Sequence, residues 1–258
     1  ILVSSVLSAF VPASVYQRFP RGVFGVPVAA LAGMAIPACE CASVPVGQSL
    51  MRRGVVPSHA LVFLLASPAI NPVVLVATAV AFNGNPMMVW ARVAASLAAA
   101  CVVGWIWMRV RFTIDGVADD ACGHHHHRSW EAFRVTAVQD FLQACGFLVI
   151  GAAIAALIKV AVPESALSVV TGNVWLGVAM MVLLAVVMSL CSEADAFVAA
   201  SFVGVSPIAQ LAFMVVGPMV DIKLVFMQAG AWRFVLRFVP LVLVAAVLSA
   251  VGVGIVLL

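Results

Sequence analysis

Long apolar runs, separated by short polar breaks, fill most of this 258-residue chain. A helix needs roughly 20 apolar residues to cross the hydrocarbon core of a bilayer. Only 9% of the residues are charged and the mean hydropathy is +1.21, whereas about 25% of a soluble domain is charged. Gly and Pro inside the runs are typical of membrane helices, because strands of a membrane barrel would alternate apolar and polar residues. The sequence therefore predicts an all-α polytopic membrane protein.

The hydropathy pattern predicts about eight apolar elements. They cover residues 1–12, 23–37, 57–82, 86–109, 138–161, 172–190, 206–229 and 233–258. The first is too short to span a bilayer, and the chain opens at Ile1. We therefore expect upstream sequence to complete that helix.

One long polar stretch, residues 111–136, divides the chain. It contains several arginines, including Arg128, and the positive-inside rule therefore predicts that it lies in the cytoplasm. This division predicts a first membrane repeat over 1–110, a His-rich cytoplasmic loop over 111–136 and a second membrane repeat over 137–258.

The expectation of repeats comes from a shift of the chain by 150 positions. The matched pairs are Cys41 and Cys191, Gly54 and Gly204, Pro57 and Pro207, Leu61 and Leu211, Phe63 and Phe213, Pro68 and Pro218, and Asn71 and Asp221. The small alphabet of apolar helices explains the Leu and Phe matches, but not a Cys, a Gly, two Pro and an Asn/Asp pair in one ungapped register. Repeated halves are common in transporter folds, and they are either inverted or parallel.

Each half also contains a proline-rich break, "ASPAINP" at 66–72 and "VGPMVD" at 216–221. Proline removes a backbone donor, and broken backbone inside a membrane is tolerated only where protein or a water-filled cavity covers it. A single proline would be a packing kink, whereas paired breaks at matched positions indicate a transport site near the bilayer midplane. The expected structural breaks are Pro45, Pro68, Pro72 and Pro218, and the polar residues expected at the site are Asn71 and Asp221.

Acidic and thiol side chains cluster beside the apolar runs in "PACECASVP" and "SLCSEADAF". A carboxylate at the bilayer centre costs at least about 2.5–3.5 kcal/mol, so such groups indicate a substrate pathway or ion coupling unless they lie at an interface. The ion-coupling candidates are Glu40, Glu193, Asp195 and Asp221, and Glu40 is also a substrate-binding candidate. Thiolates bind soft metals and metalloids, and the candidate thiols are Cys39, Cys41 and Cys191. By contrast, Cys101 and Cys145 are expected to be small buried hydrophobes.

The spacing of Cys39 and Cys41 constrains how they would bind one atom. Two residues apart on a helix, they would point to different faces. We therefore expect the stretch 37–45 to be non-helical for at least part of its length, since Pro37 and Pro45 favour irregular backbone. Alternatively, Cys41 pairs with Cys191 across the repeat interface.

The polar loop holds Cys122 and the histidines His124, His125, His126 and His127. Imidazole and thiolate suit zinc, copper or nickel, so the loop is a candidate for loose metal capture. A solvated loop without function and an engineered tag are the alternatives. His59, at a predicted helix start, is expected to be a terminal polar residue and not a ligand.

Four stretches, "PACECASVPVGQSLMRRGV", "FLLASPAINPVVLVATAVAF", "CSEADAFVAASF" and "GPMVDIKLVFMQAG", resemble the bacterial predicted-permease family that includes the organoarsenical efflux permeases. The resemblance implies a multi-pass permease of the cytoplasmic membrane. In the arsenical branch it would imply a trivalent organoarsenical substrate such as methylarsenite, bound by the thiols of Cys39, Cys41 and Cys191. That branch has a small residue between the two cysteines, and Glu40 in this position is closer to the Cys-Glu-Cys branch of the family.

These observations favour a secondary transporter, not an enzyme, that exports a small thiophilic substrate with an ion gradient. No nucleotide-binding loop of the G-x-x-x-x-G-K-[ST] type is present, and no cofactor is expected. The alternatives are a membrane thiol-disulfide oxidoreductase using Cys39 and Cys41, and a subunit of a larger membrane assembly. The expected partners are a small-molecule or metalloid substrate, the lipid bilayer, and either a second copy of the chain or another membrane protein. The dispersed net charge of +3 argues against nucleic acid.

Overall fold

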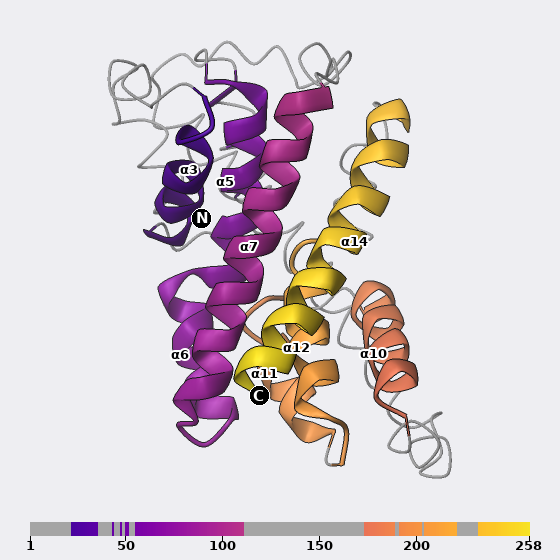
Figure 1. Cartoon of the computed structure of the whole chain (residues 1–258). Coiled ribbons are helices and arrows are strands. Elements are labelled where there is room, and N and C mark those ends of the chain that lie inside the picture. The colour runs from indigo at the N-terminus through magenta and orange to yellow at the C-terminus, as the bar shows by residue number, and fades with distance from the viewer. Residues whose placement is uncertain are drawn as a thin grey trace, which may run out of the picture.

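The computed structural model describes residues 22–35, 43, 47, 50–51, 55–110, 173–188, 191–202, 204–220 and 232–258. Every regular element within these ranges is helical, which confirms the predicted all-α fold. The helices are α3 (Gly25–Ala35), α5 (Pro57–Ile70), α6 (Pro72–Ala81), α7 (Pro86–Val110), α10 (Val174–Met188), α11 (Asp195–Ser201), α12 (Pro207–Val216) and α14 (Trp232–Leu257) (Figure 1).

Three helical segments in the described part are long and apolar enough to cross a membrane. They are Pro57–Ala81, Pro86–Val110 and Leu236–Leu257. Shorter apolar helices are α3, α10 and α12. The chain is therefore an integral membrane protein. The expected elements 1–12 and 138–161 lie outside the described residues, so the number of eight elements stays a prediction.

The described helices form two packed groups that meet along α7 and α14. In one group α3 packs on α5 and α5 packs on α7, and in the other α10 packs on α12 and α12 packs on α14. Helix α7 then packs along α14 (Figure 1). Small side chains allow these close approaches, as is common between membrane helices. At Gly33 of α3, for example, a Cβ would lie only 3.0 Å from the Phe63 carbonyl oxygen of α5.

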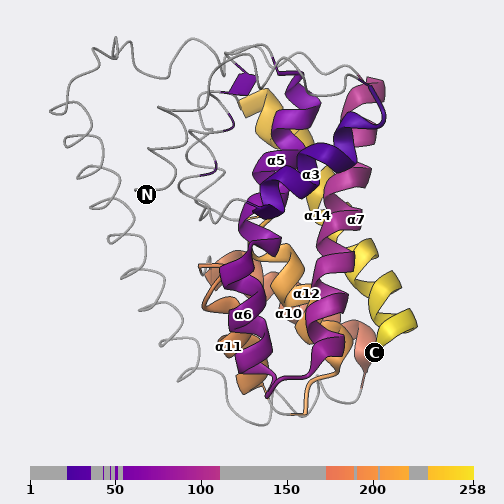
Figure 2. The same cartoon turned by 90° about the vertical axis from the view of Figure 1, so that its left-hand side faces the viewer.

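Helices α7 and α14 run in opposite directions. The C-terminus, at the end of α14, lies at the same end of the molecule as the turn between α6 and α7 (Figures 1 and 2). That turn contains Asn83 and Gly84 with φ of 53° and 77°, a left-handed backbone that Asn and Gly tolerate best. Near the C-terminal ends of the two long helices, Gly104 of α7 lies against Val62 of α5 and Gly254 of α14 lies against Ile208 of α12. Because α7 and α14 are antiparallel, α5 and α12 also begin at opposite ends of the molecule.

Candidate functional site

The first component of the site is an interrupted helix. Helix α5 ends at Ile70, and Asn71 has the extended backbone angles φ −71° and ψ 160° before α6 begins at Pro72. The Asn71 Oδ1 atom accepts a hydrogen bond of 2.9 Å from the Val74 amide, so this side chain caps α6. Pro68 lies inside α5, and the chain leaves the helical conformation three residues later.

The interruption leaves carbonyl groups at the end of α5 without helical partners. One of them, the Ala69 carbonyl, accepts a hydrogen bond of 3.2 Å from Arg92 Nε of α7. Arg92 is completely buried. A guanidinium is a suitable donor at this position because a helix C-terminus carries a partial negative charge.

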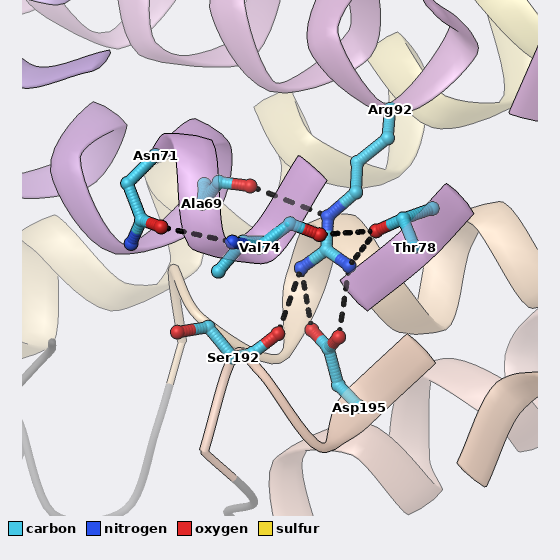
Figure 3. A network of polar contacts seen from close by, with 7 residues as sticks. All are labelled: Ala69, Asn71, Val74, Thr78, Arg92, Ser192 and Asp195. Atoms are coloured by element: carbon cyan, nitrogen blue, oxygen red, sulfur yellow. Dashed lines mark hydrogen bonds and ion pairs between the residues drawn. The ribbon is translucent and has the colours of Figure 1, made fainter. Parts of the chain in front are cut away.

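Arg92 uses all five of its N–H groups within this network (Figure 3). Besides the bond to Ala69, Nη1 donates to the Thr78 hydroxyl at 3.0 Å and to Asp195 Oδ1 at 2.8 Å. Nη2 donates to Asp195 Oδ2 at 2.7 Å and to the Ser192 carbonyl at 3.4 Å. The Thr78 hydroxyl in turn donates to the Val74 carbonyl at 2.8 Å. A buried network in which every donor is used holds its members in one arrangement.

Asp195 is the first residue of α11 and its carboxylate is almost completely buried. Its ion pair with Arg92 is bidentate and spans 103 positions of sequence. It connects α5, α6 and α7 on one side to the start of α11 on the other. Removing one partner of such a pair is strongly destabilising because the other charge stays buried and uncompensated.

The turn before α11 carries two more residues singled out in the sequence. Cys191 is partly exposed and precedes Ser192, whose carbonyl contacts Arg92. Glu193 is half-buried in the same turn. The structure therefore gathers Asn71, Cys191, Glu193 and Asp195 around the interrupted helix and the start of α11.

The remaining candidates fall into two groups. Pro218 is buried in the turn that follows α12. The others lie outside the described residues, and they are Cys39, Glu40, Cys41, Pro45, Cys122, His124, His125, His126, His127 and Asp221. Of the stretch 37–45, Ser43 alone is described, and it is helical. Among described residues no three His, Cys, Asp or Glu side chains come together as a metal site.

His59 lies near the start of α5, as expected of a terminal polar residue. It is 2% exposed, and its Nε2 atom lies 3.1 Å from the Gly22 carbonyl oxygen. This contact gives the imidazole a backbone partner in front of α3.

Arg92, Thr78 and Ser192 are the site residues that the sequence patterns missed. A signal for Arg92 was present, because an arginine inside an apolar span is a functional candidate by default. Thr78 carries no comparable signal, since single hydroxyl residues are common in membrane helices. Ser192 contributes its backbone carbonyl, which the residue type does not reveal. Their importance depends on the position of the guanidinium.

The fold and this site define a polytopic helical membrane protein with a buried charged network beside an interrupted helix. The family described as "Predicted permease" matches residues 1–255, and the chain belongs to this family.

Two curated proteins are similar over most of their length. A Streptococcus mutans protein named "Putative two-component membrane permease complex subunit" is 32% identical over 93% of this chain and 85% of its own length. The Bacillus subtilis "UPF0718 protein YcgR" is 34% identical over 95% of this chain and 87% of its own length. No solved structure matches the chain.

Proposed function

We propose that this chain is a secondary transporter of the bacterial cytoplasmic membrane that exports a small thiophilic substrate, an organoarsenical or a soft metal or metalloid species. The observation that carries the proposal is the interrupted helix α5–α6 with the buried Arg92–Asp195 pair beside it. Interrupted helices and buried ionisable side chains are typical of substrate and ion pathways in transporters.

The proposed transporter consists of two inverted repeats, 1–110 and 137–258, joined by a cytoplasmic loop. The shift of 150 positions that relates the two sequences also pairs α3 with α10, α5 with α12 and α7 with α14. It pairs Gly104 with Gly254, and these glycines pack against the paired helices α5 and α12 of their own halves. The opposite directions of α7 and α14 support an inverted relationship, in which the substrate site lies between the halves.

The proposed substrate ligands are the thiols of Cys39, Cys41 and Cys191, with Asn71 and Asp221 lining the same site. A soft metalloid exchanges its ligands readily with thiolates. The position of Cys191 supports its assignment as a ligand, since it directly precedes Ser192, whose carbonyl accepts a hydrogen bond from Arg92. The acidic residues near this turn, above all Asp195, are proposed to couple substrate movement to an ion gradient.

A second candidate is that the chain works as one subunit of a two-component permease. The name of the similar Streptococcus mutans protein favours this alternative. In that case the partner would complete the transport pathway or supply substrate recognition.

Reconstitution distinguishes the two candidates. The purified chain alone is reconstituted into proteoliposomes, and substrate uptake through molecules inserted in the inside-out orientation is measured under an imposed pH gradient. Methylarsenite, arsenite and divalent soft metals are tested separately. Saturable, gradient-dependent flux by the chain alone would support the secondary transporter. Flux that requires a second protein co-purified from the native membrane would support the complex, and thiol–disulfide turnover without flux would contradict both.

A further inference from the structure

The Arg92–Asp195 pair joins the two proposed repeats, but the positions that the repeat relates to it do not carry a second such pair. With the shift of 150 positions, Arg92 corresponds to Val242 of α14 and Asp195 corresponds to Pro45. Val242 is as deeply buried as Arg92, but it is apolar. The charged pair is therefore an asymmetric feature in a scaffold in which α3, α5 and α7 correspond to α10, α12 and α14.

The hydrogen bonds of Arg92 divide between two groups of elements, α5 and α6 on the one hand and the start of α11 on the other. Its bonds to Ala69 and Thr78 attach it to α5 and α6, while three bonds attach it to the start of α11 at Ser192 and Asp195. Two of the three end on the carboxylate. Arginine keeps its proton at any accessible pH, so the group in this network that can gain or lose a charge is Asp195.

We propose that the Arg92–Asp195 pair is a proton-sensitive latch: a proton taken up by the Asp195 carboxylate releases α11 and opens this end of the transport pathway. The proton binds one carboxylate oxygen, and the neutral acid no longer compensates the guanidinium. Arg92 stays attached to Ala69 and Thr78. A buried cation without a partner must be hydrated or must bind another anion, so protonation draws water or an anionic group into the gap beside α11. Arg92 is in this sense the positioning residue for Asp195.

Few other charged groups act on Asp195. Arg92 of α7 and Glu193 of the preceding turn are the two that interact with it among the described residues. The two helices that pack most against α11 are α6 and α12, and neither contains a titratable side chain. Burial of the carboxylate is the main cause that raises the pKa of Asp195, and the half-buried Glu193, which has the same charge, adds to it and does not replace Arg92.

The proposed orientation places the latch at the outer end of the protein. Arg92 lies about 9 Å along α7 from its start, because a helix rises about 1.5 Å per residue. The His-rich loop 111–136, proposed to be cytoplasmic, follows the far end of α7. Protons would then reach Asp195 from outside, as an exporter driven by proton entry requires. This inference rests on the proposed function for its direction, while the latch itself can be tested without any substrate.

Cys191 is a natural reporter, because it is partly exposed and lies four residues before Asp195. In the full chain with Cys39, Cys41, Cys101, Cys122 and Cys145 replaced by serine, the rate of Cys191 alkylation by N-ethylmaleimide is measured in proteoliposomes across a pH series. Each rate is divided by the rate for the same chain in sodium dodecyl sulfate at the same pH. This ratio removes the change in thiolate fraction and leaves the accessibility of the thiol.

For the reporter chain that keeps Arg92 and Asp195, the ratio of alkylation rates is expected to rise by about tenfold as the pH falls, in the range typical of coupled equilibria. Asp195→Asn is expected to keep the ratio high at every pH. Ser96→Ala is the matched control, because Ser96 is a buried residue of α7 outside the network. It is expected to keep the normal pH response. A ratio that does not change with pH in the reporter chain with Arg92 and Asp195 overturns the latch even if Asp195→Asn fails to fold. A responsive ratio in the reporter chain, together with no substrate flux by the unmodified chain with or without a partner, would instead contradict the proposed function and leave the latch standing.

Discussion

Gly104 of α7 and Val62 of α5 are in direct contact, so close that a Cβ on Gly104 would collide with the Val62 Cγ2 atom. The same Cβ would lie 3.0 Å from Val26 Cγ1 of α3. One glycine therefore determines how closely three helices approach. Gly254 of α14 has a similar role, since a Cβ there would lie 3.1 Å from Ile208 Cγ1 of α12.

The first prediction concerns this contact. Gly104→Ala is expected to destabilise the folded protein by about 1–3 kcal/mol, because an extra methyl group overpacks the interface between the helices. Adding Val62→Ala should recover part of this loss, since it removes the colliding methyl group. Gly252→Ala of α14 is the matched control, because a Cβ at this position meets no atom within 4 Å. Thermal unfolding in detergent, followed by circular dichroism, measures all four proteins.

Equal stability of Gly104→Ala and Gly252→Ala would contradict the packing. Failure of Val62→Ala to recover stability would show that the overpacking lies against Val26 instead. The comparison needs no substrate.

The second prediction separates stability from transport at the ion pair. Arg92→Met and Asp195→Leu should each destabilise the protein by about 3–5 kcal/mol, because each leaves one buried charge unpaired. The double variant should recover most of this stability, since apolar side chains replace both charges. Transport by the double variant should nevertheless be lost. Unfolding and flux are measured on the same preparations.

Arg92→Lys is the conservative variant in this series. Lysine keeps the charge but lacks the planar fork that binds a carboxylate in bidentate fashion. It is expected to fold with intermediate stability and to transport more slowly than the parent chain. Full transport by the double apolar variant would show that the pair is structural only.

The third prediction uses two Asn-Pro pairs in the same half. Asn71 caps α6 in the protein interior, and Asn85 caps α7 at an exposed position through a bond of 3.0 Å to the Met87 amide. Loss of a helix cap costs about 0.5–2 kcal/mol, so Asn71→Ala and Asn85→Ala should lower stability by similar amounts. Only Asn71→Ala should also reduce transport, because Asn71 lies at the helix interruption beside Arg92. Equal flux in the two variants would contradict a role for this interruption.

The sequence predicted the helices well because two physical signals are strong in a membrane protein. Apolar runs fixed the spans to within a few residues, as for 86–109 against Pro86–Val110. The proline-rich stretch 66–72 indicated an interruption of the span 57–82, since proline lacks the donor that a continuing helix needs, and the chain leaves the helical conformation at Asn71 within it. The packing of α7 on α14 left no such signal, because it depends on small side chains dispersed along two helices.

The site was less predictable for a related reason. Asp195 was singled out as an acidic residue beside an apolar run, but the sequence does not show which cation it meets 103 positions earlier. The role of the Ala69 carbonyl was also hidden, because it depends on where the helix ends and which side chain then approaches. Such contacts follow from the tertiary arrangement and not from local pattern.

The last prediction concerns the thiols. If Cys39, Cys41 and Cys191 bind a soft substrate, the triple serine variant should lose flux of methylarsenite almost completely, because a hydroxyl is a poor ligand for a soft metalloid. Cys101→Ser is the matched control: Cys101 is 8% exposed in the core of α7, so its replacement should affect stability more than flux. Cys41→Ser alone should reduce flux more than Cys101→Ser, and Glu40→Gln should change the pH dependence of flux by removing a titratable group beside the thiols. Initial rates in proteoliposomes, normalised to the amount of folded protein, measure each variant. Unchanged flux in the triple variant would mean that the three thiols are packing residues. The soft-substrate assignment would then fail. Transport through the Arg92–Asp195 site would be tested with other small molecules.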